Sequence, residues 1–105
     1  MKVRFSESAA AAYDDALTRI RAANRFAAVR FADKVGQAVR RIGRYPQSGH
    51  FVPEYVNVPV RQFIIEPCRF FYFIDERNKT IRIIDVWHGA QLPAYPNLPE
   101  VGAPR

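Results

Sequence analysis

The residues best suited to chemistry in this chain lie in one stretch, from Val60 to Ala90. Arg61 and Arg69 stand at the start of two predicted β-strands, and His88 ends a third. Arginine pairs with phosphate or carboxylate groups, and histidine exchanges protons near neutral pH. The stretch therefore predicts a short basic sheet that binds something anionic or carries out proton chemistry on it.

Turn chemistry predicts how the second and third of these strands pair. A two-residue turn at Arg77-Asn78 gives these opposite pairs: Asp75 with Thr80, Phe73 with Arg82, Phe71 with Ile84, and Arg69 with Val86. Because side chains alternate between the two faces of a strand, Arg69 and His88 would then share one face and one end of the sheet.

The turn between the first two strands leaves two alternatives. A two-residue loop at Pro67-Cys68 places Arg61 on the face opposite Arg69, whereas a three-residue loop at Glu66-Pro67-Cys68 places both arginines and His88 on one face. A slip of one residue exchanges the two outcomes.

The middle strand, with the run FFYFI from Phe70 to Ile74, is apolar on both faces. Such a strand is typical of a sheet covered on both sides. Two helices can cover one face only. The other face is expected to meet the C-terminal tail, a partner chain or a ligand that stacks on aromatic rings.

The first half of the chain predicts a short strand and a helical hairpin. Lys2 to Phe5 is the strand candidate, and Ser6 has the side chain of a helix N-cap. Apolar residues at helical spacing follow to about Ala23, and Asn24 either ends that helix or caps the next. A second apolar stripe runs from Phe31 to Ile42, with Gly43 and Pro46 stopping the helix. The fold class is therefore α+β, with the strand and hairpin packed on a small antiparallel sheet.

Length and composition set the remaining limits. A chain of 105 residues forms one domain, expected over residues 1–92, and residues 93–105 form a proline-rich tail; residues 46–59 are expected to be a loop. The net charge of +6 favours anionic partners such as nucleic acid or an acidic protein segment. Cys68 is the only cysteine, which fits the reducing cytoplasm, and with His50 and His88 it supplies too few ligands for a closed zinc site, so we expect no metal or cofactor. No apolar run is long enough to span a bilayer.

Several short motifs together resemble the RelE/ParE superfamily of type II toxin–antitoxin toxins. They are N-x-x-A-A-x-x-F (Asn24–Phe31), P-x-x-G (Pro46–Gly49), P-E (Pro53-Glu54), V-R (Val60-Arg61), R-F-F-Y (Arg69–Tyr72) and V-W-H-G-A (Val86–Ala90). The likeness covers about residues 2 to 92. It implies a helical hairpin packed on a small antiparallel sheet, and a co-expressed antitoxin that wraps the toxin with an extended or helical segment.

Two target classes follow from this resemblance. ParE-like members poison DNA gyrase, and RelE-like members cleave messenger RNA on the ribosome without a metal ion. V-W-H-G-A is closer to the ParE type, with the helical hairpin and basic surface engaging gyrase. The chain also lacks two features of the nuclease branch, lysines clustered on the first sheet strand and a tyrosine soon after the last strand.

If the nuclease alternative holds, the resemblance implies a catalytic set. Metal-free RNA cleavage needs a base, cations that stabilise the phosphorane and an acid for the leaving oxygen. Glu54 would be the base, Arg61 and Arg69 the cations, and His88 the acid. Each residue also has a purely structural interpretation: Arg69 as an ion-pair partner of Asp85 or Glu66, His88 as a hydrogen-bonding residue at a strand end, and Glu54 as a local cap or ion pair.

Overall fold

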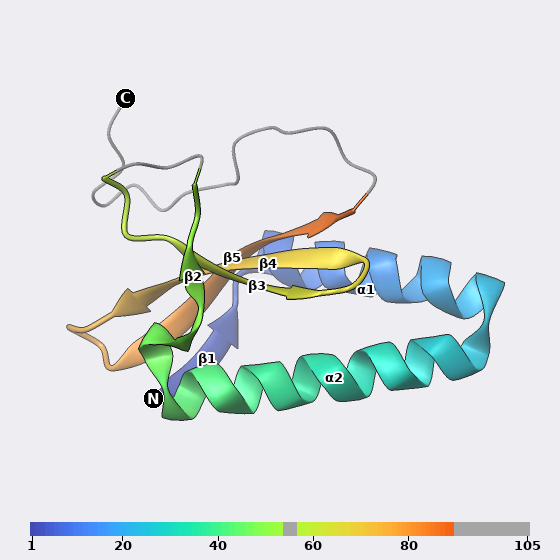
Figure 1. Cartoon of the computed structure of the whole chain (residues 1–105), viewed down its shortest axis with the longest axis horizontal. Coiled ribbons are helices and arrows are strands. Elements are labelled where there is room, and N and C mark those ends of the chain that lie inside the picture. Colours follow the sequence, from blue (N-terminus) through green and yellow to red (C-terminus); the bar gives the residue numbers. More distant parts are fainter. Residues whose placement is uncertain (54–56, 90–105) are drawn as a thin grey trace.

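The computed structural model describes residues 1–53 and 57–89. Within that part of the chain, five strands form one sheet in the order β1-β5-β4-β3-β2 (Figure 1). The elements in chain order are β1 (Lys2–Phe5), α1 (Glu7–Ala23), α2 (Arg25–Arg44), the 3-10 turn η1 (Pro46–Ser48), β2 (His50–Phe51), β3 (Arg61–Ile65), β4 (Cys68–Asp75) and β5 (Thr80–His88). The predicted α+β class is confirmed. The sheet is mixed rather than antiparallel, because β1 pairs in parallel with β5.

The predicted capping residues are present at the helix ends of the hairpin. The Ser6 hydroxyl accepts a hydrogen bond from the amide of Ala9 at 3.1 Å and so begins α1. Asn24 does both of the things expected of it. Its amide donates to the carbonyl of Ile20 at 2.8 Å, and its side-chain oxygen accepts from the amide of Phe26 at 2.9 Å. The two helices therefore meet at one residue and lie antiparallel on one face of the sheet (Figure 1).

The larger core lies between this hairpin and the sheet. Phe70 and Tyr72 of β4 are fully buried in it, and Phe31 of α2 is nearly so. The rings of Phe63 and Phe70 stack with centroids 4.7 Å apart. Every second residue of β4 thus faces the helices, as strand alternation requires.

A second, smaller core covers the opposite face. Phe71 of β4 is fully buried here, with Trp87 of β5 against it and ring centroids 5.0 Å apart. The rest of this cluster comes mainly from β5 and from the segment that leads into β3: Val52, Val58, Val60 and Ile84. The predicted need for cover on both faces is therefore met in part by the chain's own segment before β3, a cover that the sequence did not suggest.

The segment from 46 to 59 was expected to be a plain loop, and this is wrong at two places. It contains η1 and the short edge strand β2. The buried Tyr72 hydroxyl holds the segment on the sheet, because it donates to the carbonyl of Pro46 at 2.8 Å and accepts from the amide of Gly49 at 2.9 Å. This long-range anchor, which no local pattern reveals, fixes residues 46–49 against the sheet.

No helix in the described part of the chain is long and apolar enough to cross a membrane. The predicted boundary at residue 92 and the tail from 93 to 105 lie outside the described residues.

Candidate functional site

Arg69 lies on the sheet face that points away from the helices. Its guanidinium is stacked over the ring of Phe71 at 5.0 Å and the ring of Trp87 at 5.6 Å. Its Nε donates to the side-chain oxygen of the buried Gln62 at 2.9 Å. The Trp87 indole in turn donates to a carboxylate oxygen of Asp85 at 3.2 Å. The arrangement is a cation held in place on an aromatic platform, with its plane oriented by a buried amide.

Part of the predicted register of β4 and β5 is confirmed, and part is wrong. Asp75 faces Thr80 as expected, although the turn has four residues, 76–79, rather than two. A bulge then follows, because Tyr72 pairs with Ile83 while Phe71 pairs with Asp85. The extra residue on β5 advances the pairing by one position from there on.

The bulge overturns the expectation that Arg69 and His88 share a face. Arg69 stands opposite Trp87, not Val86, and His88 stands opposite Cys68. Cys68 belongs to the helix-side core, where burial raises the pKa of its thiol to about 11. His88 therefore lies on the helix side of the sheet, at the same end as Arg69 but on the other face.

His88 borders a hollow of about 400 Å³ at the tip of the helical hairpin. Its walls are largely apolar and come from both helices and from the turn before β4: Arg19, Ile20, Ala23, Asn24, Ala27, Phe31, Glu66 and Pro67. The hollow is separated from the Arg69 platform by the sheet itself.

The guanidinium of Arg61 is used in contacts within the protein. Its guanidinium donates to the carbonyl of Gly49 at 2.9 Å and to that of Gln47 at 3.2 Å, and it lies over the Phe51 ring at 4.1 Å. Arg61 pairs with Tyr72 in the sheet, so it faces away from Arg69. The two-residue alternative is therefore right about the face on which Arg61 lies. It is wrong about the position of the loop, which is Glu66-Pro67 and not Pro67-Cys68, because Ile65 pairs with Cys68.

The structure does not bring Arg61, Arg69 and His88 together. Arg61 binds the segment before β3, and the other two lie on opposite faces of the sheet. Glu54 lies outside the described residues. The role of these residues in catalysis stays a prediction, and among the four candidates Arg69 is the one around which the described residues form a compact cluster.

Sequence reasoning missed Gln62, which is only 8% exposed and orients Arg69. It also assigned no role to Gly49, whose amide donates to the Tyr72 hydroxyl on the helix side of the sheet, away from Arg69. No sequence motif marks Gln62, because it reaches Arg69 only through its pairing opposite Phe71 in the sheet. Gly49 is the glycine of the P-x-x-G motif, so that motif was the signal for it.

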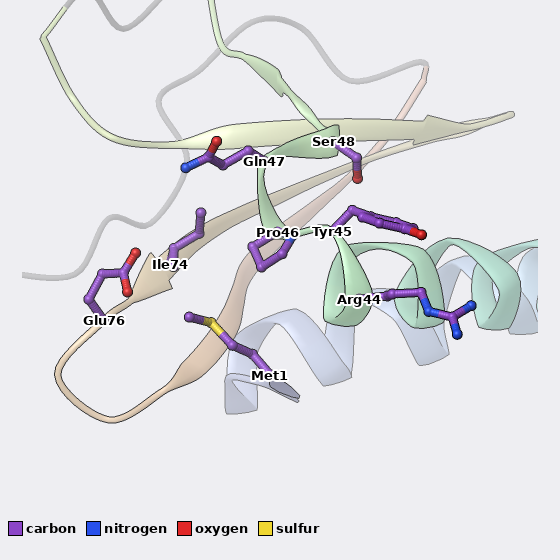
Figure 2. A pocket seen from close by; sticks show the side chains of 8 residues that line it. All are labelled: Met1, Arg44, Tyr45, Pro46, Gln47, Ser48, Ile74 and Glu76. Atoms are coloured by element: carbon purple, nitrogen blue, oxygen red, sulfur yellow. The ribbon is translucent and has the colours of Figure 1, made fainter.

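A different hollow, of about 350 Å³, lies where the chain start meets the end of α2. Figure 2 shows that its two charged side chains, Arg44 and Glu76, lie on opposite sides of it and point apart. It therefore lacks the converging polar groups of a binding or catalytic pocket.

An α1–α2 hairpin on a small sheet, with Arg69 near the start of the aromatic strand β4, is consistent with the fold of the RelE/ParE superfamily. Residues 3–93 match the family model described as ParE toxin of type II toxin-antitoxin system, parDE. The chain therefore belongs to the ParE family of type II toxins. Membership implies a cognate antitoxin as partner. Comparison with curated proteins gives no match.

Proposed function

We propose that this chain acts in the cytoplasm as a ParE-type toxin that arrests bacterial growth by poisoning DNA gyrase, and that its antitoxin neutralises it. The observation that carries the proposal is the family match over residues 3–93. The separation of Arg69 from His88, and the use of the Arg61 guanidinium by backbone carbonyls, favour a toxin that acts by binding over a nuclease.

The outer edge of β3 supports neutralisation by an extended segment. In the described part of the chain, β2 pairs only with Arg61 and Gln62, so the edge from Phe63 to Ile65 has no strand beside it. Ile64 on this edge is 55% exposed. An unpaired, apolar strand edge favours the addition of a strand from a partner chain.

Expression of the chain alone is expected to arrest growth, and co-expression of the antitoxin gene to restore it. Purified protein should inhibit supercoiling by purified gyrase, and the arrest should come with DNA-damage signalling. The measurement is a supercoiling assay beside growth curves, with the toxin–antitoxin complex as control. Normal growth at a high level of folded protein would contradict an active toxin.

His88→Ala separates gyrase poisoning from messenger RNA cleavage. A nuclease with His88 as general acid would lose about 10²–10⁴-fold in cleavage rate. We expect growth arrest by the variant to remain nearly unchanged, because His88 lies across the sheet from Arg69. Mapping of messenger RNA ends after induction checks this. If messenger RNA is cut at codon positions in the wild type and not in the variant, the target is the translating ribosome and not gyrase.

A further inference from the structure

Two arginines stand directly opposite each other on neighbouring strands. Arg4 of β1 pairs with Arg82 of β5 in the parallel register, and both side chains are exposed. Lys2, two residues earlier on the same face of β1, adds a third cation. Like charges in this position destabilise a sheet. In residues 1–53 and 57–89, neither arginine lies within ion-pair distance of a carboxylate.

The pair lines a hollow of about 420 Å³. Polar groups from the ends of β1, β4 and β5 complete its wall: Ser6, Asp75, Asn78 and Thr80, with Phe5. Asp75 is the acid of this hollow, and its two carboxylate oxygens accept from the backbone amide and side-chain amide of Asn78, at 3.1 and 2.8 Å. The hydrogen bonds from Asn78 and the nearby charge of Arg82 hold the pKa of the Asp75 carboxyl below its ordinary value, so this carboxylate stays charged and offsets part of the charge of Arg82. Two arginines still face one acid in this hollow, which leaves a net positive charge for an anionic ligand.

The position of Arg82 is further defined by an aromatic neighbour. Its guanidinium lies over the Phe73 ring at 5.9 Å, on the face of the sheet that carries Arg69 and not the helices. An arginine held in this way loses less freedom when it binds an anion through its planar fork.

We propose that Arg4 and Arg82 form a phosphate-binding site that holds the backbone of DNA. Arginine side chains match the oxygens of a phosphodiester, and the net charge of +6 draws the chain to a polyanion. The choice of DNA over an acidic polypeptide rests on the proposed function, because gyrase acts while bound to DNA. The site would let the toxin bind the enzyme and its DNA together.

The test is the salt dependence of binding to a labelled DNA duplex, measured by fluorescence anisotropy with the purified full chain. The double variant R4Q/R82Q removes the pair. The double variant R30Q/R40Q on α2 is the matched control, because it makes the same charge change at exposed positions on the helix side. Loss of two phosphate contacts should lower the slope of log K against log salt by about 1.8. Between 50 and 200 mM salt, the wild type should then lose about twelvefold more affinity than R4Q/R82Q.

The control is expected to keep the wild-type slope. An equal loss in both double variants, or none in R4Q/R82Q, would overturn the site. The single variants R4Q and R82Q should each give about half of the change. Circular dichroism should show a folded R4Q/R82Q with a midpoint of thermal unfolding no lower than that of the wild type, since the change removes a like-charge contact.

Two further probes identify the source of the anion. Inorganic phosphate should compete with the duplex only weakly, and polyglutamate should bind less tightly than DNA. Tighter binding of polyglutamate that depends on the pair would overturn DNA in favour of an acidic protein. A chain that poisons gyrase with an unchanged DNA slope in R4Q/R82Q would refute this site alone. A chain that binds DNA through the pair but leaves gyrase active would refute the proposed function alone.

Discussion

Replacement of Gly49 by alanine is expected to lower the free energy of unfolding. The loss should be larger than for alanine at Gly36 or Gly43, where an added Cβ has more space. A Cβ at this position would lie 2.7 Å from Tyr72 Cε1 and 2.8 Å from the Gln62 carbonyl oxygen, and would contact the Tyr72 hydroxyl. The limit is space and not backbone conformation, since Gly49 has an extended φ of −76°. Overpacking costs about 1–3 kcal/mol, and a buried hydroxyl that loses its partner adds about 1–3 kcal/mol.

The measurement is chemical denaturation of Gly49→Ala beside Gly36→Ala. The nearest atom to a Cβ on Gly36 would be Arg40 Nη1, at an ordinary contact distance of 3.5 Å. Because Gly36 lies inside α2, its replacement should stabilise the protein, by about 0.5–1 kcal/mol. The two substitutions make the same chemical change and should move stability in opposite directions. Equal stability of both variants would show that Gly49 is not packed closely against the Tyr72 side chain.

Arg69→Ala is expected to abolish growth arrest and to weaken, without unfolding, the sheet face around it. The change leaves the side-chain oxygen of the buried Gln62 without the Arg69 Nε donor, at a cost of about 1–3 kcal/mol. Loss of the stacking on Phe71 and Trp87 adds about 0.5–2 kcal/mol. Arg69→Lys should recover little of the stability lost with the hydrogen bond or with the stacking, because lysine keeps the charge but has no planar group to stack on the rings.

Growth assays and thermal unfolding of Arg69→Ala decide between the functional and the structural interpretation. Arg77→Ala, an exposed arginine in the turn after β4, is the control and should change neither readout. A folded and fully toxic Arg69→Ala would remove Arg69 from the functional surface. An unfolded variant would leave it a structural role only.

Local signals in the sequence determined the helical hairpin and the presence of every strand of the sheet except β2. Ser6 and Asn24 cap their helices through bonds to amides two or three residues away, so their effect is readable without the rest of the chain. The doubly apolar run from Phe70 to Ile74 likewise predicted that both faces of β4 would be covered, because strand alternation is also a local property.

Tertiary structure alone decided which functional candidates meet. The bulge opposite Phe71 moves His88 to the helix side, and nothing in the residue types marks it, because one extra residue on β5 costs little and depends on packing against β4. The pairing of Arg4 with Arg82 depends on β1 joining the sheet beside β5, a contact between residues 78 positions apart. Gln62 and Gly49 acquire their roles in the same way, through neighbours distant in the chain. Local chemistry therefore defined the elements, and long-range register, which a shift of one residue reverses, defined the site.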